Sequence, residues 1–391
     1  MNILQNAQAV ESRVREWRRH IHVHPELGMD TEGTAAFVEK NLREMGVSNI
    51  RRCGSTGVVA LIEGRPGDAC VGLRADMDAL PVNERNDLPF KSINSGAAHV
   101  CGHDVHTACL LGTAQVLQDL RAEFRGMVKL IFQPGEEGAG GAAKMIADGV
   151  LRDPEMQSIF ALHVWPDLPA GTVGFRRGAV LASAQRVTIR IRGKQGHAAH
   201  PHRCIDPILM AGHVICGLQA IVAREMAPLD TGVLSLGKIT GGTAGNIIPE
   251  EVVIEGTVRA LSKEVSRQIT EAGRRIVEGT TATFRGSGSF EVGEGLPPVV
   301  NDDALFDMMR ESFVRDFGET RVRTLPAPSM GGEDFALYLE HVPGAHFRLG
   351  VGQEGQNNFP LHSPDFVVDE SGFAYGVAGM AILALEALKK A

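Results

Sequence analysis

The chain has 391 residues, of which 43% are hydrophobic and 22% are charged, and its formal net charge is −8. This length exceeds what one hydrophobic core usually supports, so we expect two domains. The negative charge and the lack of any lysine- or arginine-rich tract argue against a nucleic-acid partner, because phosphate binding requires a basic surface.

The cysteines and the apolar runs indicate the compartment. Six cysteines, at positions 53, 70, 101, 109, 204 and 216, are too few for a disulfide scaffold in so long a chain. The first 19 residues are polar and amphipathic and do not resemble a signal peptide, and no apolar run reaches the ~18 residues that span a bilayer. We therefore expect a cytoplasmic protein with no membrane partner.

The first part of the chain alternates strand and helix patterns. Short apolar runs predict strands at 58–62, 71–74, 128–132 and 158–162, and periodicity predicts a helix over 107–120. This alternation is typical of an α/β fold, in which helices cover both faces of a mixed sheet.

The pattern changes from about residue 184. Residues 186–192 alternate polar with apolar side chains, as in a half-exposed antiparallel strand. The elements predicted next are a helix at 207–223, strands at 233–239 and 252–258, a helix at 263–281 and a strand near Phe290, followed by helices at 302–316, 332–340 and 371–389. The β-α-β-β-α-β order is ferredoxin-like. We interpret residues 184–295 as a small α+β domain inserted into a larger one formed by residues 1–183 and 296–391.

Cys101-Gly102-His103-Asp104 places a thiolate, an imidazole and a carboxylate within four residues, far from any CxxC partner. A lone cysteine is more often a buried apolar residue than a ligand. The nearby His103, in a glycine-containing loop, leaves both interpretations open.

Further polar residues follow predicted strands. Asp76, Asp78, Glu136, Glu137 and His163 all come close after one, and ligands of open α/β sheets bind beyond the carboxyl ends of the strands. Alone, His163 would be a core histidine and the acid pair a solvated turn. In one crevice, paired acids can divide metal binding from proton transfer.

Two other features carry less weight. His20, His22 and His24 alternate along a predicted helix end, a spacing that spreads side chains around a helix. Residues 138–143 fit a loose dinucleotide-binding pattern, but the preceding acids would repel a pyrophosphate, so we interpret them as a glycine-rich helix entry.

Several motifs in order resemble the M20 metallopeptidases. The resemblance is to the amidohydrolase branch, which includes hippurate hydrolases, N-acyl-amino-acid amidohydrolases and indole-acetyl-amino-acid hydrolases. The motifs are RRHIHVHPELG from Arg18, LRADMDALP from Leu73, HVCGHDVHTA from His99, FQPGEEG from Phe132, LHVWPDLPAGTVG from Leu162, GKQGHAAHPH from Gly193, GNIIPEEVVIEGTVR from Gly245, SMGGEDFA from Ser329 and LHSP from Leu361.

The resemblance implies a two-metal centre in the larger domain. Its ligands would be Cys101, His103, Glu137, His163 and His362, and Glu136 would be the general base. The peptidase branches have an H-x-D motif where this chain has Asp76-Met77-Asp78. The cysteine site is expected to replace that histidine, which leaves the role of Asp76 open and Asp78 as a support for the ligands.

The resemblance also assigns residues outside the metal centre. His197 would donate to the oxyanion, within its own subunit or across a dimer interface. Asn246 and Arg259 would hold the substrate's carbonyl and terminal carboxylate, for which a bidentate arginine is well suited. The inserted domain would then be a lid and dimerisation domain.

These observations predict metal-dependent hydrolysis of the amide bond of N-acyl-amino acids, hippurate-like or N-acetyl, with release of a carboxylic acid and an amino acid. We expect two divalent ions, zinc or manganese, with cobalt and nickel as alternatives. We also expect a homodimer or homotetramer formed through the inserted domain. Three alternatives stay open: a dipeptidase or aminopeptidase of the same superfamily, a non-catalytic metal- or ligand-binding protein, and, last, a dehydrogenase.

Overall fold

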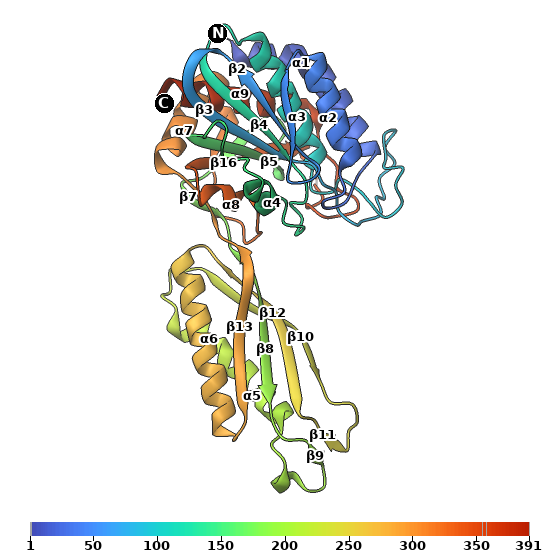
Figure 1. Ribbon diagram of the computed structural model, residues 1–391, viewed down its shortest axis with the longest axis vertical. Coiled ribbons are helices and arrows are strands. Elements are labelled where there is room, and N and C mark those ends of the chain that lie inside the picture. Colours follow the sequence, from blue (N-terminus) through green and yellow to red (C-terminus); the bar gives the residue numbers. More distant parts are fainter. Residues whose placement is uncertain (1, 354, 357, 391) are drawn as a thin grey trace. The chain divides into compact units, whose positions relative to one another are not determined.

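The computed structural model describes residues 2–353, 355–356 and 358–390, which form two compact units (Figure 1). Unit 1 comprises Met1–Val180, Val300–Ala327 and Asp334–Ala391, and unit 2 comprises Leu181–Val299 and Pro328–Glu333. Each unit has its own hydrophobic core.

Unit 1 is built on a mixed eight-stranded sheet in the order β1-β2-β4-β3-β5-β16-β6-β15. Its strands are β1 (Asn49–Cys53), β2 (Gly57–Glu63), β3 (Arg65–Asp76), β4 (Arg125–Gln133), β5 (Ser158–Pro169), β6 (Val173–Phe175), β15 (Val322–Thr324) and β16 (Gly344–Gly352). β3 runs parallel to both β4 and β5, and β5 runs parallel to β16. A further pair, β7 (Gly178–Leu181) and β14 (Val299–Asn301), contains the boundaries between the units.

Helices flank this sheet (Figure 1). They are α1 (Ile3–Val23), α2 (Glu32–Glu44), α3 (His103–Asp119), α4 (Gly141–Ala147), α7 (Asp303–Phe317), α8 (Phe335–Leu339) and α9 (Phe373–Lys390), with 3-10 turns η3 (Glu319–Arg321) and η4 (Glu370–Gly372). α1, α3 and α9 pack against one another, and α9 also contacts β3, β4 and β5. The expected α/β fold is confirmed.

Two helical segments, Pro207–Glu225 and Glu370–Lys390, are long and apolar enough to span a membrane, which the sequence analysis did not anticipate. In α9, all residues except Tyr375, Glu386 and the two terminal lysines are buried. A helix that is apolar on all sides is also what the centre of a large core requires.

Unit 2 is a four-stranded antiparallel sheet in the order β10-β12-β8-β13 with two helices. Its elements are β8 (Ala184–Arg192), β9 (Gly196–His197), η1 (Pro201–Arg203), α5 (Pro207–Ala220), the π-helical η2 (Ile221–Glu225), β10 (Gly232–Gly241), β11 (Ile247–Ile248), β12 (Glu251–Ala260), α6 (Lys263–Thr283) and β13 (Ser287–Leu296). This is the predicted ferredoxin-like order.

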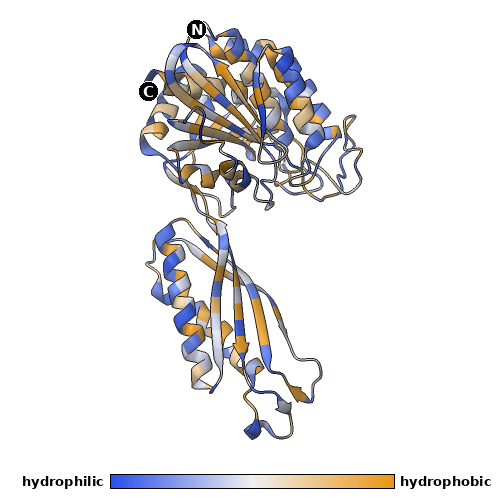
Figure 2. Cartoon of the chain, in the orientation of Figure 1, coloured by the Kyte–Doolittle hydropathy of each residue, from blue (hydrophilic) through white to orange (hydrophobic). Residues whose placement is uncertain are grey.

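The side-chain pattern explains why unit 2 has one covered face. Buried residues of α6 recur every three or four positions, from Val265 through Ile269 to Val277, while most of its other residues are polar (Figure 2). In β8, Val187, Ile189 and Ile191 alternate with exposed or half-exposed polar residues. The two patterns match a helix stripe packed on one sheet face.

Candidate metal centre

The candidate residues lie where parallel strands of unit 1 end. Asp76 is the last residue of β3, Glu136 and Glu137 follow the end of β4, and His163 lies within β5. Because these three strands are parallel, their carboxyl ends share one edge of the sheet. The predicted clustering of these residues is therefore observed.

A cysteine and two histidines meet at this edge. The Cys101 Sγ atom lies 3.5 Å from Nε2 of His163, and ligand atoms of Cys101, His103 and His163 all lie within 4.8 Å of one another. The loop requires Gly102, whose φ is +86° and where an added Cβ would lie 2.2 Å from a Val164 methyl. A residue with a side chain would displace the loop that presents Cys101.

The tautomer of His163 can be assigned from its hydrogen bond. Its Nδ1 lies 2.7 Å from the carbonyl oxygen of Val164, to which it must donate. The lone pair of Nε2 therefore points toward Cys101 and is available to a cation.

Glu137 and His362 extend the cluster. Oε1 of Glu137 lies 3.2 Å from Nε2 of His362, and their ligand atoms lie within 4.8 Å of that of Cys101. His362 has φ of +68°, rare for a residue with a side chain, and its N–H donates to the Val100 carbonyl. Such strain, held by a hydrogen bond, is common where a side chain must be aimed.

Asp78 positions the acid pair. Its two carboxylate oxygens accept the backbone N–H groups of Glu136 and Glu137, at 3.0 and 3.1 Å. Oε1 of Glu136 in turn accepts the N–H of Asp334 at 3.3 Å. Asp78 thus holds the backbone of the acid pair in place, and each of its carboxylate oxygens accepts one of these hydrogen bonds.

The cluster is electrostatically suited to a cation. Burial raises the pKa of the Cys101 thiol well above its ordinary value, so a thiolate exists there only with a cation against it. Burial and nearby His106 hold the pKa of His163 well below its ordinary value, which keeps the ring neutral. Burial alone would lower the pKa of His103, but the Asp76 carboxylate and Cys101 outweigh burial, so the net pKa lies well above the ordinary value.

The residues present fit a bound metal ion. Nε2 of His103 is buried and has no hydrogen-bond partner in the described part of the chain. A buried polar atom without a partner is costly, and a cation would satisfy it. Three overlapping groups of ligand atoms, each within 4.8 Å, connect the five expected ligands: Cys101/His103/His163, Cys101/Glu137/His362 and His103/Glu136/Glu137.

A buried network behind the cluster was not predicted. Asp76 bonds to Nδ1 of His106 at 2.6 Å and to Arg74 at 2.7 Å, and Arg74 also bonds to Asp334. Since Nε2 of His106 accepts the Val164 N–H, the proton sits on Nδ1 and neither ring nitrogen is free for metal. Through His106 the network joins the end of β3 to β5, and both carboxylate oxygens of Asp76 are hydrogen-bonded within it.

Asp104, next to His103, is held by hydrogen bonds to residues of α1. One of its oxygens, Oδ2, accepts hydrogen bonds from Arg18 at 2.7 Å and from His22 at 2.8 Å. His22 bonds to Glu84 through its other nitrogen. Both ring nitrogens of His22 are therefore occupied by hydrogen bonds to carboxylates.

The expected substrate residues belong to unit 2. His197 on β9 pairs with Ile247 on β11, and the Asn246 carbonyl accepts the Ala198 N–H. Nδ1 of His197 accepts the N–H of Ala199 at 3.0 Å, so a neutral ring carries its proton on Nε2.

Arg259 lies far from these two residues, near the other end of β12. The short strands β9 and β11 extend from one end of β8, β10 and β12, whereas Arg259 is the penultimate residue of β12 (Figure 1). It lies eight positions after the first residue of β12, which corresponds to about 26 Å at ~3.3 Å per residue. Its guanidinium donates to the Met330 carbonyl at 2.8 Å.

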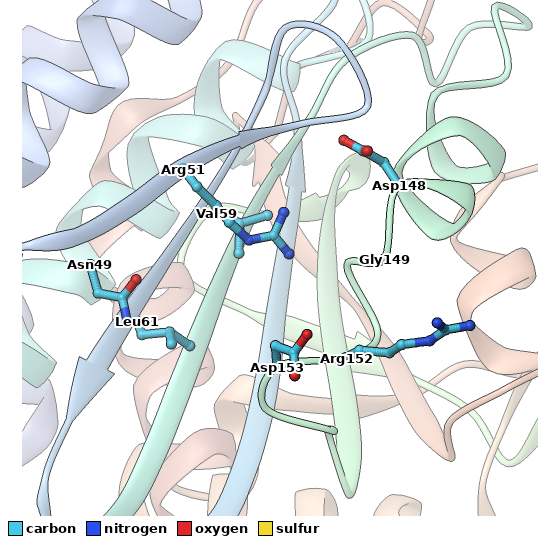
Figure 3. Close-up of a pocket in the computed structure, with 8 residues that line it drawn as sticks. All are labelled: Asn49, Arg51, Val59, Leu61, Asp148, Gly149, Arg152 and Asp153. Atoms are coloured by element: carbon cyan, nitrogen blue, oxygen red, sulfur yellow. The ribbon is translucent and has the colours of Figure 1, made fainter.

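A separate pocket of about 460 Å³ contains none of the predicted residues (Figure 3). Its side chains come from β1, β2 and the segment after α4. They are Asn49, Arg51, Val59, Leu61, Asp148, Gly149, Arg152 and Asp153. No histidine or cysteine lines it, so it does not compete with the cluster as a metal site.

Known proteins resemble this chain over nearly its whole length. A probable hydrolase of Synechocystis is 42% identical over 98% of both chains, and an N-acetylcysteine deacetylase of Bacillus subtilis is 39% identical over 98% of this chain and 99% of its own. The crystal structure of a B. subtilis protein described as a dinuclear metal binding peptidase from the M20 family is 37% identical, with a TM-score of 0.87 over 98% of this chain and 100% of its own. The model of peptidase family M20/M25/M40 matches residues 72–386, so the chain belongs to this family.

Proposed function

We propose that this protein is a divalent-metal-dependent amidohydrolase that cleaves the amide bond of N-acyl-amino acids, releasing a carboxylic acid and an amino acid. The observation that carries the proposal is the cluster of five ligand side chains with Glu136 beside it. The deacetylase relative supports the substrate class, because N-acetylcysteine is an N-acyl-amino acid.

Two divalent ions would be held by Cys101, His103, Glu137, His163 and His362. The thiolate and imidazoles favour zinc and the carboxylate also accepts manganese, with cobalt or nickel as alternatives. When bound, such ions supply Lewis acidity, which lowers the pKa of water and polarises the scissile carbonyl.

Glu136 is proposed as the general base. It accepts the proton of the water that attacks the carbonyl carbon and then delivers it to the departing amine nitrogen. Its backbone N–H is anchored by Asp78, and Asp334 donates to its side chain, so the carboxylate is fixed beside the ligands.

His197, Asn246 and Arg259 are proposed to act on the substrate. The proton on Nε2 of His197 suits it to donate to the developing oxyanion, and Arg259 suits the α-carboxylate. One small substrate cannot bridge the roughly 26 Å between Arg259 and the far end of β12. We therefore infer that His197 and Asn246 serve the active site of a second copy in a homodimer or homotetramer formed through unit 2.

We infer a cytoplasmic location for the enzyme. All six cysteines are free, and Cys101 must be reduced to bind metal. A reducing compartment preserves that state.

A dipeptidase is the second candidate, because the B. subtilis structural relative is described as a peptidase. The two activities differ in the group attached to the scissile carbonyl, which carries a free amine in a dipeptide. Rates on N-acetyl- and N-benzoyl-amino acids, compared with rates on dipeptides of the same C-terminal residue, separate them.

The Glu136→Gln variant tests the mechanism. We expect kcat on N-acetyl-amino acids to fall by about 10²–10⁴-fold while bound metal and KM change little. The neighbouring Glu137→Gln variant is the matched control and should instead lose metal. Turnover that survives in a metal-loaded Glu136→Gln enzyme would rule out this residue as the base.

A further inference from the structure

Arg348, on β16, is a buried cation with unused donors. The residue is 5% exposed, and its Nε and Nη2 atoms have no hydrogen-bond partner in the described residues. Its guanidinium carbon lies 3.5 Å from the centroid of the Trp165 ring. Buried guanidinium donors without an acceptor are rare and costly, which points to an acceptor outside the chain.

The position of Arg348 places it beside the metal cluster. In the parallel β5–β16 ladder it pairs with His163, so both side chains lie on the same face, on strands about 4.8 Å apart. Trp165 follows His163 by two residues and therefore shares this face. The unpaired guanidinium is thus adjacent to an expected ligand, within unit 1.

A second unpaired arginine lies nearby. Nε and Nη1 of Arg176 are buried and have no hydrogen-bond partner among the described residues. Arg176 follows Gly174 by two residues, and Gly174 pairs with Arg348 in the β6–β16 ladder. Burial lowers the pKa of Arg348 to about 10, and the charge of Arg176 contributes to this shift while that of Asp167 opposes it. Two neighbouring cations with unpaired donors are suited to an anion.

The stacking of Arg348 on Trp165 favours a planar anion. Because the guanidinium lies against an aromatic ring, its remaining donors point outward in one plane. A planar carboxylate accepts two parallel hydrogen bonds from such an edge, whereas a neutral amide offers one acceptor oxygen.

We propose that Arg348, with Arg176 beside it and Trp165 stacked on it, binds a second carboxylate of the substrate. This rests on the proposed function, in which Arg259 already holds the α-carboxylate. The preferred substrates are then N-acyl-amino acids with an additional carboxylate, carried by the amino-acid side chain or by the acyl group.

Two matched substrate pairs test the proposal and show whether the second carboxylate is carried by the amino-acid side chain or by the acyl group. The side-chain pair is N-acetyl-glutamate and N-acetyl-glutamine, and the acyl pair is N-succinyl-alanine and its succinamoyl amide. We expect kcat/KM to favour the charged member about 10–100-fold in one pair, and Arg348→Gln to remove that preference. The adjacent exposed Arg177, paired with Asp303 and Asp307, gives the matched control Arg177→Gln, which should keep the preference. Equal rates within both pairs, or a preference that persists in Arg348→Gln, overturns the proposal.

Binding can be measured without turnover. The chain has two tryptophans, so in a Trp17→Phe, Glu136→Gln protein the fluorescence reports Trp165. Titrating this metal-loaded protein should give a saturable change with the dianion of the preferred pair, about tenfold weaker with its neutral partner, and weakened again by Arg348→Lys, which keeps charge but loses the planar fork. If the proposed function is wrong, the enzyme with Glu136 intact will not hydrolyse these compounds, although the dianion still binds selectively. Hydrolysis without selective binding contradicts the anion site alone.

Discussion

The two units differ in how deeply their expected functional residues are buried. In unit 1, Cys101, His103 and His163 are buried, and hydrogen bonds from the core orient their neighbours. In unit 2, His197 and Asn246 are exposed beyond the sheet, and Arg259 is half-buried near the end of a strand. All five expected ligands belong to unit 1 and all three expected substrate residues belong to unit 2, so we predict that metal binding depends on unit 1 and substrate positioning on unit 2.

Replacing Cys101 by alanine is the strongest way to test this separation. We expect loss of bound metal and a fall of activity to background, because this side chain belongs to two of the three groups of ligand atoms that connect the expected ligands. Elemental analysis and kcat measured on the same preparation provide the test. Cys109→Ala, at a fully buried cysteine within α3, should keep its metal, and metal loss in both variants would indicate general unfolding instead.

His197→Ala tests unit 2. We expect kcat to fall by about 10²–10³-fold, as for loss of an oxyanion donor, with unchanged metal content. Mixed oligomers of His197→Ala and Glu136→Gln chains should recover activity, because one site then has an intact Glu136 and receives His197 from the other chain. If mixed oligomers stay inactive, His197 acts within its own subunit.

Asp78→Asn should have the smallest effect of the three. Asparagine keeps one acceptor oxygen for two backbone N–H groups, so the acid pair loses one anchor. We expect metal affinity to weaken about 10–100-fold, measured by competition with a chelator. Asp148→Asn, at an exposed aspartate that accepts the Gly54 N–H, is the matched control and should leave this affinity unchanged.

Much of the fold was predictable because the pattern within each element is simple. Alternation in β8 and periodicity in α6 correspond to one buried face each, and both were predicted. The central strand β16 was missed, although all nine of its residues are buried. Its sequence includes His346 and Arg348, and polar residues in a fully buried strand obscure the apolar run that would indicate it.

The candidate site was predicted less evenly. The expected ligands could be identified because each stands in a motif with chemistry of its own. Arg74, His106 and Asp334 lie in the same motifs but were assigned no role. Their contacts join different elements, since Arg74 and His106 both bond to Asp76 and Arg74 also bonds to Asp334. Pairings between residues as far apart as Arg74 and Asp334 cannot be inferred from one sequence.

The metal content of the purified protein tests the central claim most directly. Elemental analysis with graded reloading of chelated protein gives the number of ions per chain alongside hydrolysis of N-acetyl-amino acids. We predict two divalent ions per chain, with activity restored as the sites fill. Full activity in a protein that holds no divalent ion would contradict the account.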